Sequence, residues 1–415
     1  MSCTVPDPLN ARDLLADVAV IGGGIIGLGI ALEAQRAGHR VMLIDPDPAA
    51  GATFAAAGML APVSELHYQE EELLALTLAS SVRWPGFIRT LASESDLDPG
   101  FRTTPTLALG ADAADRAALG DLREAQARQG LRVARLTTRE ARAREPMLSP
   151  HISAAHLIET DHQVDPRALA RAIMARLAAV GAERDGTPPE RTLLRTSATT
   201  LLHEDAADSG SPVTGVRLAD GTEVHARETV LANGLGAADF GGLPRSLVLP
   251  LRPVHGDILR LRVPEHLRPL TTATLRGMVR GLPVYLVPRE DHTVVIGATA
   301  REDGNPGVSA GGVHQLLRDA QVLLPAVAEL ELIETTARAR PGTPDNAPLL
   351  GRVAAGNGAD VAGLLIATGF FRHGVLLTPI AAHVIVELIA GRRDRAWDRF
   401  RPDRFSPAPQ PKEYA

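Results

Sequence analysis

Glycines near the N-terminus have the spacing of a loop that binds phosphate groups. Gly22, Gly24 and Gly27 fit G-x-G-x-x-G, directly after a β-branched segment and before an Ala- and Ile-rich segment typical of a helix. Such glycines permit a tight turn, let the backbone approach a pyrophosphate, and let helix and strand pack closely. Asp45 ends the next apolar segment, where a carboxylate can bind a ribose diol and would repel a 2′-phosphate. The pattern predicts a site for FAD or NAD rather than NADP, and the alternative is a tight turn without a ligand.

Arg338 and Arg340 are candidates for binding an acid group. They lie two positions apart, so on a strand their side chains would share one face. A guanidinium pairs with a carboxylate through two hydrogen bonds and stays charged at every relevant pH. The alternative is a pair of exposed arginines, which is the commoner environment for this residue type.

Two further segments are candidates for contact with a flat ring system. Residues 55–59 are alanines followed by a glycine and a methionine, and small side chains let a backbone run close to a ring. The alternative is close packing of small residues under a helix. Residues 369–374 form a turn bounded by glycines before a C-terminal helix, whose first N–H groups would stabilise negative charge.

The elements that would position these groups lie at both ends of the chain. A strand at 18–21, a helix at 25–37 and a strand at 41–44 make a βαβ unit that opens a parallel sheet. A buried strand at 364–367 and a helix at 375–389 return near the C-terminus, and mixed β segments occupy the middle. A sheet that uses both ends implies an inserted second domain. We therefore predict an α/β fold with a Rossmann-like domain and a second, α+β domain.

Composition excludes several classes of protein. The 415 residues are 45% hydrophobic and 22% charged, which is typical of a globular chain long enough for two domains. The net charge is −6 without a long basic run, so nucleic acid is not an expected partner. Cys3 is the only cysteine, which fits a reducing cytoplasm and excludes a disulfide within the chain. No secretory signal, membrane-spanning segment or metal-ligand spacing is evident, so we expect no metal and no stable membrane insertion.

Further segments complete a recognisable pattern when they are taken in order. They are Thr-Phe-Ala-Ala-Ala-Gly-Met-Leu-Ala-Pro at 53–62, Val-Tyr-Leu-Val-Pro-Arg at 284–289, Val-Ile-Gly-Ala-Thr at 295–299, Ala-Arg-Pro-Gly-Thr-Pro-Asp at 339–345 and Gly-Phe-Phe-Arg-His-Gly at 369–374. Together with the glycine loop, they resemble the D-amino-acid oxidase superfamily, and within it the glycine oxidases of thiamine biosynthesis. The resemblance extends from about residue 16 to residue 397.

The resemblance implies a discontinuous FAD-binding domain roofed by an antiparallel sheet with helices. We expect the FAD-binding domain at 1–90, 151–240 and 338–400, the substrate-binding domain at 91–150 and 241–337, and a C-terminal tail at 401–415. It also implies non-covalent FAD, because related sarcosine oxidases attach flavin through a cysteine in their C-terminal half, where this chain has none. A homo-oligomer, of the tetrameric kind found in the family, is a further expectation.

The resemblance also assigns site residues. Substrate contacts are expected from Arg340, the acid clamp, and from Tyr285, Arg372 and Met59. For Tyr285 and Arg372 the alternatives are an ordinary strand tyrosine and a capping or surface arginine, and His373 is expected to make local hydrogen bonds rather than act as a base. The expected FAD contacts are Gly22, Gly24, Ile25, Ile26, Gly27, Asp45, Pro46, Thr53, Ala57, Gly58, Met59, Ala198, Gly234, Gly369, Phe371, Arg372, His373, Gly374, Val375 and Leu376.

The implied activity is oxidative deamination of glycine and other small amines. A hydride would pass from the substrate Cα to the flavin N5, and O₂ would become H₂O₂. The imine would hydrolyse to a 2-oxo acid or enter thiazole synthesis. Ala300 stands where glycine oxidases often carry methionine, so more room for sarcosine or small D-amino acids is expected. The alternatives are a D-amino-acid dehydrogenase, a sarcosine oxidase, an NAD-dependent dehydrogenase and a non-catalytic flavin-binding redox sensor.

Overall fold

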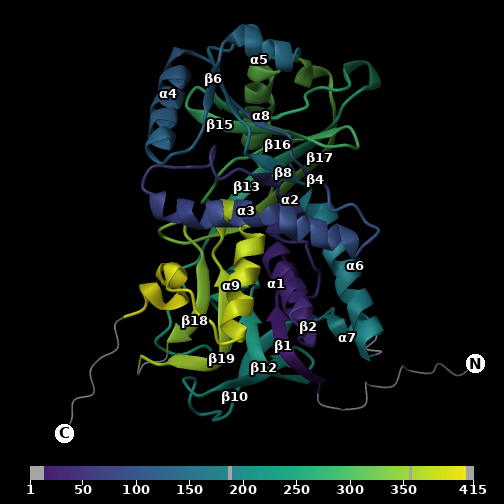
Figure 1. Ribbon diagram of the computed structural model, residues 1–415, viewed down its shortest axis with the longest axis vertical. Coiled ribbons are helices and arrows are strands. Elements are labelled where there is room, and N and C mark those ends of the chain that lie inside the picture. Colours follow the sequence, from purple (N-terminus) through teal and green to yellow (C-terminus); the bar gives the residue numbers. More distant parts are fainter. Residues whose placement is uncertain (1–13, 186–188, 355–357, 408–415) are drawn as a thin grey trace, which may run out of the picture.

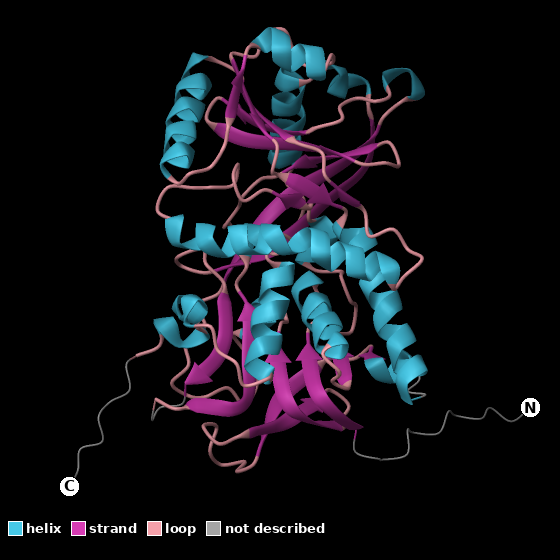
Figure 2. Ribbon diagram, viewed as in Figure 1, coloured by secondary structure: helices cyan, strands magenta, loops and turns pink. Residues whose placement is uncertain are grey.

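The computed structural model describes residues 14–185, 189–354 and 358–407. The molecule is elongated, with one large sheet towards each end and the long helix α3 (Glu71–Ser93) crossing between them (Figure 1). Helices cover both sheets, as Figure 2 shows in cyan and magenta. Among the described residues, no helix combines the length and the apolar content needed to cross a bilayer.

The first sheet joins strands from the two ends of the described chain. β12 pairs in parallel with β1 along its length, and its second half pairs in parallel with β19. β2 lies on the other side of β1, also parallel. The strands of this sheet are β1 (Leu14–Ile21), β2 (Val41–Ile44), β9 (Leu193–Leu194), β10 (Ala198–His203), β11 (Val213–Leu218), β12 (Glu223–Leu231), β18 (Leu349–Ala354) and β19 (Asp360–Thr368). The expected parallel sheet built from both ends is confirmed.

Three helices pack over one face of this sheet: α1 (Ile25–Arg36), α6 (Pro166–Asp185) and α9 (Thr378–Ile389). α1 contacts both of the others, and its residues are almost all buried. A β-carbon at Gly29 would overlap the side chain of Thr378, so α1 and α9 pack at close range because position 29 is glycine. The short helix α2 (Ala52–Ala55) contacts α6 and β17 (Glu331–Gly342), and the short helix α7 (Pro189–Thr192) contacts α6 and β2.

The second sheet is antiparallel except where β14 pairs in parallel with β5. Its strands are β5 (Thr106–Gly110), β6 (Ala134–Leu136), β7 (Ala154–Ile158), β13 (Arg252–Arg262), β14 (Thr274–Val279), β15 (Leu282–Pro288), β16 (Thr293–Gly297) and β17 (Glu331–Gly342). It is accompanied by α4 (Ala113–Arg128), α5 (Thr138–Arg144) and α8 (Ala310–Leu323). A small sheet joins β3 (Met59–Leu60), β8 (His162–Val164) and β4 (Phe101–Arg102).

The strand pairing bears on two of the expected domain boundaries. β7 lies in the range 151–240, which was expected in the FAD-binding domain, yet it pairs with β5 in the second sheet. The expected tail also begins within structure, because Asp403 accepts a hydrogen bond from the Ala354 N–H at 2.9 Å and Pro402 is buried. We propose that the boundary lies after β7 and that the FAD-binding domain continues to about residue 405. Cys3 lies outside the described residues.

Candidate active site

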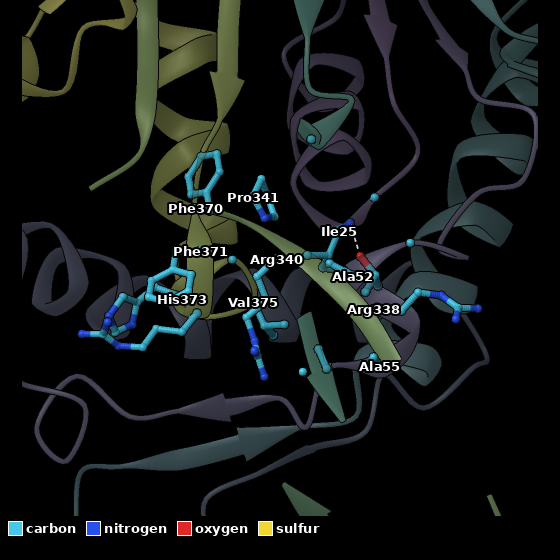
Figure 3. A pocket seen from close by; sticks show the side chains of 18 of the residues that line it. Ile25, Ala52, Ala55, Arg338, Arg340, Pro341, Phe370, Phe371, His373 and Val375 are labelled. Carbon is cyan, nitrogen blue, oxygen red and sulfur yellow. Dashed lines mark hydrogen bonds between the residues drawn. The ribbon is translucent and has the colours of Figure 1, made fainter. Parts of the chain in front are cut away.

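A cavity of about 660 Å³ lies where the two sheets approach each other. Its size is within the range of about 300–1,000 Å³ that is usual for small-molecule sites. Its walls come from the N-terminal glycine loop, residues 49–67, the turn after β12, the strands β13–β17 and the turn before α9. Figure 3 shows Arg340 in the middle of this site, between the turn that carries Phe371 and the helix that carries Ala52.

The glycine loop has the expected conformation. Gly22 has a φ of 104°, and its N–H donates to the Ile44 carbonyl at 2.9 Å. Gly24 caps α1 without a side-chain hydrogen bond, and the Ile25 N–H donates to Thr53 Oγ1 at 2.9 Å, the dashed line in Figure 3. The N-terminus of α1 therefore opens into the cavity with its positive dipole end, as an anion site requires.

Asp45 has a second role that the motif alone does not reveal. Its carboxylate accepts hydrogen bonds from the Gly23 N–H at 2.6 Å and from the Asp47 N–H at 2.8 Å. It lines the cavity as expected, and it also fixes the shape of the loop.

Most of the expected site residues line the cavity, and four do not. Gly27 supports the loop from behind, because a β-carbon there would overlap the Gly22 carbonyl oxygen. Pro46 is exposed beside Asp45, and Ala198 begins β10 on the antiparallel side of the first sheet. Gly369 has a φ of 72° and packs against Thr343. Gly27 and Gly369 therefore support the site through packing and turn geometry, whereas Pro46 and Ala198 lie outside the cavity lining.

The small-residue segment runs along the cavity wall and is held from outside. Gly58 has a φ of 75°, and a β-carbon there would overlap the Val164 carbonyl. Arg289 donates to the Ala57 carbonyl and, at 2.8 Å, to Gln163 Oε1. Burial lowers the pKa of Arg289 to about 10, so the group remains a cation at neutral pH. In the sequence, Arg289 stands out only as part of a motif, and its contact with the Ala57 carbonyl was not predicted.

Arg340 lies on β17 with its guanidinium beside Gly256 of β13, where any β-carbon would collide with it. Its Nη1 donates to the Thr299 carbonyl at 3.2 Å. In the part of the chain that the structure describes, no carboxylate lies within ion-pair distance of Arg340, whereas Arg338 donates to the Ala50 carbonyl at 3.0 Å. The two guanidinium groups end in different parts of the site (Figure 3). Arg340 therefore offers an uncommitted positive charge to a ligand.

The support for Arg340 comes from a buried ion pair behind it. The hydroxyl of Thr299 donates to Asp257 Oδ2 at 2.7 Å, and Asp257 also pairs with Arg301 at 3.1 Å. Asp257 is fully buried, and Gly312 on α8 leaves the space that its carboxylate fills. These contacts fix the backbone at Thr299, to which Arg340 donates.

Tyr285 stands directly opposite Gly297 in the β15–β16 pair, and a β-carbon at Gly297 would collide with its ring. Burial raises the pKa of Tyr285 to about 12, so the phenol stays protonated and can donate a hydrogen bond. Tyr285 and Arg340 both line the cavity.

Arg372 lines the cavity as expected but is already paired with two carboxylates. Its Nε lies 3.2 Å from Glu65 Oε2, and its Nη2 contacts Glu70. Glu65 also contacts Arg276 of β14. Although burial raises the pKa of Glu65, Arg276 and then Arg372 outweigh it and lower that pKa to about 2. The sequence offered no local signal for this cluster.

The turn before α9 is fixed by α3. The Leu376 carbonyl accepts hydrogen bonds from Trp84 Nε1 at 2.9 Å and from Ser80 Oγ at 2.6 Å. α9 begins at Thr378 rather than at 375, because residues 371–373 form a 3₁₀ turn first. Burial and then Arg372 lower the pKa of His373 to about 3, so its imidazole is neutral.

A buried aspartate holds the loop that carries Glu65. Asp161 is fully buried and accepts hydrogen bonds from the N–H groups of Val63, at 3.1 Å, and Ser64, at 2.7 Å. Burial raises the pKa of Asp161 to about 6. A raised pKa of an acid means that the folded state favours the proton, so this stabilising contribution is complete below about pH 3.8 and is lost as the pH rises through 6.

We therefore expect the wild type to lose stability relative to Asp161→Asn as the pH rises. The shift corresponds to about 3 kcal/mol in total, of which about 1 kcal/mol falls between pH 5 and 7. Urea unfolding of both proteins across this range measures the difference, with the exposed Asp208→Asn as the control for loss of one charge. A difference that does not vary with pH would contradict the assignment.

The cavity fits a flavin dinucleotide. The glycine loop supplies the phosphate site, residues 55–59 supply a close backbone, and the turn before α9 supplies a third wall. Asn233 Oδ1 is buried without a hydrogen-bond partner among the described residues, and Asn233 lines the cavity. A buried acceptor left unpaired is costly, which favours a ligand with donors at this position.

Comparison with known sequences agrees with this geometry. A family model described as FAD dependent oxidoreductase (DAO) matches residues 17–388. The bifunctional protein ThiO/ThiG of Trichormus variabilis is 31% identical over 401 residues, covering 94% of this chain and 55% of that protein. The chain spans about half the length of the bifunctional relatives that it matches. Glycine oxidase of Geobacillus kaustophilus is 30% identical over 389 residues, covering 92% of this chain and 94% of that protein.

Solved structures show the same architecture. The crystal structure of glycine oxidase from Geobacillus kaustophilus aligns with a TM-score of 0.81 at 28% identity, covering 95% of this chain and 100% of that one. The structure of iminodiacetate oxidase from Chelativorans sp. BNC1 aligns with a TM-score of 0.78 at 25% identity, covering 95% and 100%. The expected fold is confirmed by these alignments.

Proposed function

The chain belongs to the FAD dependent oxidoreductase family (DAO), and from this we propose that it oxidises glycine and other small amino acids. The observation that carries the proposal is the free guanidinium of Arg340 beside the protonated phenol of Tyr285, in a cavity whose other end is the glycine loop. Such a pair of donors suits a carboxylate. A substrate held there by its acid group would present its α-carbon to the ring site.

The residues that would hold FAD divide into three groups. Gly22, Gly24 and the first turn of α1 would bind the pyrophosphate, and Asp45 would bind the ribose. Residues 57–59 and 371–376 would lie against the ring. When bound, FAD supplies a two-electron acceptor that O₂ can reoxidise. We propose that the attachment is non-covalent.

The chain's own groups orient the substrate rather than remove a proton from it. Glu65 has a pKa of about 2 and is a weak base, and His373 is neutral and buried. The substrate amine must therefore arrive unprotonated, and positioning by Arg340 and Tyr285 accounts for the contribution of the protein. Ala300 lines the cavity with a small side chain, which favours sarcosine and small D-amino acids as further substrates.

Anaerobic mixing of the FAD-loaded protein with glycine, sarcosine and D-alanine tests the proposal. The visible absorbance of the flavin should bleach with each reactive amine, and air should then restore it with release of H₂O₂. Bleaching without reoxidation by O₂ would instead favour a dehydrogenase that uses a quinone. Absence of bleaching by any small amine would favour the redox-sensor alternative and contradict an oxidase.

The proposal extends to the cellular role. The similarity to ThiO/ThiG proteins supports a role in supplying the glycine-derived imine to thiazole synthesis, and we propose that this takes place in the cytoplasm. We propose a homo-oligomer, with the tetramer of the resembled family as the first expectation. Light scattering of the FAD-loaded protein measures its mass.

A further inference from the structure

The arginines and glutamates at the substrate end of the cavity leave one positive charge unbalanced. Arg276, Arg340 and Arg372 supply the cations, and Glu65 and Glu70 pair with two of them. His373 adds no charge because its pKa is lowered to about 3, first by burial and then by Arg372. The balance suits a substrate with a single carboxylate, which Arg340 is free to bind.

Glu65 occupies the place that a second substrate carboxylate would take. One of its oxygens contacts Arg276, and the other lies 3.2 Å from Arg372 Nε. The Arg372 Nε–H is nevertheless buried without a hydrogen-bond partner among the described residues. Glu65 and Glu70 together thus neutralise the two guanidinium groups without using all of their donors.

This pair of arginines lies within reach of a substrate bound at Arg340. Arg276 is directly opposite Tyr285 in the β14–β15 pair, so their side chains share one face of the sheet. Glu65, Tyr285 and Arg340 line the same cavity as Arg276. A molecule with two acid groups that is bound at Arg340 would therefore meet Arg276 in the same cavity.

We propose that Arg276 and Arg372 form a second carboxylate subsite, and that Glu65 fills it and restricts the enzyme to amines with one acid group. The inference rests on the proposed function in taking Arg340 as the site of the first carboxylate. Glu65 is a fixed occupant, because Asp161 holds the backbone of its loop through Val63 and Ser64. Its side chain is only 11% exposed, so water does not easily replace it.

Removing Glu65 should open the subsite to dicarboxylic amines. We expect Glu65→Ala to raise the ratio of kcat/KM for iminodiacetate to that for glycine by about 10- to 100-fold, the effect of new charge-assisted hydrogen bonds. The ratio of kcat/KM for D-aspartate to that for glycine should also rise. Glu65→Asp keeps the negative charge and should retain most of the exclusion. Adding Arg276→Met to Glu65→Ala should abolish the gain, because one wall of the subsite is then lost.

A matched control removes a glutamate from a comparable ion pair whose two residues do not line the cavity. Glu228 pairs with Arg352 at 2.7 Å and is 15% exposed, so Glu228→Gln should leave the substrate ratio unchanged. An unchanged ratio in Glu65→Ala would overturn the proposal. So would a wild-type enzyme that already prefers iminodiacetate to glycine.

A binding experiment without turnover separates this inference from the proposed function. The flavin spectrum of the FAD-loaded protein is titrated with acetate and with malonate, which carry one and two carboxylates. The wild type should bind acetate more tightly than malonate, and Glu65→Ala, which empties the subsite, should reverse this order. Glu65→Gln removes the charge but keeps the shape of the side chain, so it should only reduce the preference for acetate. Tighter binding of malonate by the wild type would overturn the proposal, even if Glu65→Ala fails to fold. Failure of glycine to reduce the flavin would instead contradict the proposed function alone.

Discussion

Replacing Arg340 by alanine should raise the KM for glycine by roughly 100-fold or more while FAD stays bound. The pair of a guanidinium with a substrate carboxylate in a cavity is worth several kcal/mol when one partner is removed, and each 1.4 kcal/mol is about tenfold. No carboxylate among the described residues competes for Arg340, so the loss of its guanidinium should appear entirely as weaker binding of the substrate. Steady-state H₂O₂ production measures kcat and KM, and the flavin absorbance measures cofactor content.

Two further variants sharpen this test. Arg340→Lys keeps the charge and loses the paired donors, so it should recover only part of the affinity. Arg262→Ala removes an exposed arginine from the neighbouring strand β13, where it pairs with Glu331, and should leave glycine kinetics unchanged. Unaltered glycine kinetics in Arg340→Ala would refute Arg340 as the acid clamp.

The conformation of the glycine loop and the position of Arg340 in the cavity could be predicted because each belongs to a short sequence motif. The turn at Gly22 and the helix that follows are specified within a few residues, and Val41–Ile44 forms a strand with the predicted bounds. Arg340 was identified from its motif, and its placement in the cavity agrees with that expectation. That β7 pairs with β5 of the second sheet could not be predicted in this way, because strand pairing depends on residues far apart in the chain and not on a local pattern.

The residues that support the site could not be predicted, because their partners are far away in the chain. Glu65 contacts Arg276 across 211 positions, and Arg289 reaches the Ala57 carbonyl across 232. Neither contact leaves a trace in the local sequence. Gly256 is a similar case. From sequence, a glycine within a strand indicates only an irregularity of that strand. The pairing of β13 with β17 shows that the missing side chain at position 256 leaves room for the Arg340 guanidinium.

Gly22→Ala should abolish tight FAD binding. Gly22 has a φ of 104°, and a β-carbon there would lie 2.6 Å from the backbone of Ala232 and Asn233. The strained φ and the overlap each cost about 1–3 kcal/mol, so the loop should shift and its N–H groups should lose their alignment on the pyrophosphate. We expect the dissociation constant for FAD to rise at least about 30-fold and the apparent unfolding temperature to fall by about 5–10 °C.

Gly51→Ala is the matched control for this prediction. Gly51 also lines the cavity, but a β-carbon there would meet no atom within 4 Å, and its φ is −76°. Both variants are compared by equilibrium dialysis against FAD and by thermal unfolding. The comparison separates the effect of distorting the loop at Gly22 from the effect of replacing any glycine of the cavity wall by alanine. Because the overlap at Gly22 involves backbone atoms that cannot rotate away, Gly22→Ala with wild-type FAD affinity would show that the pyrophosphate does not bind at this loop.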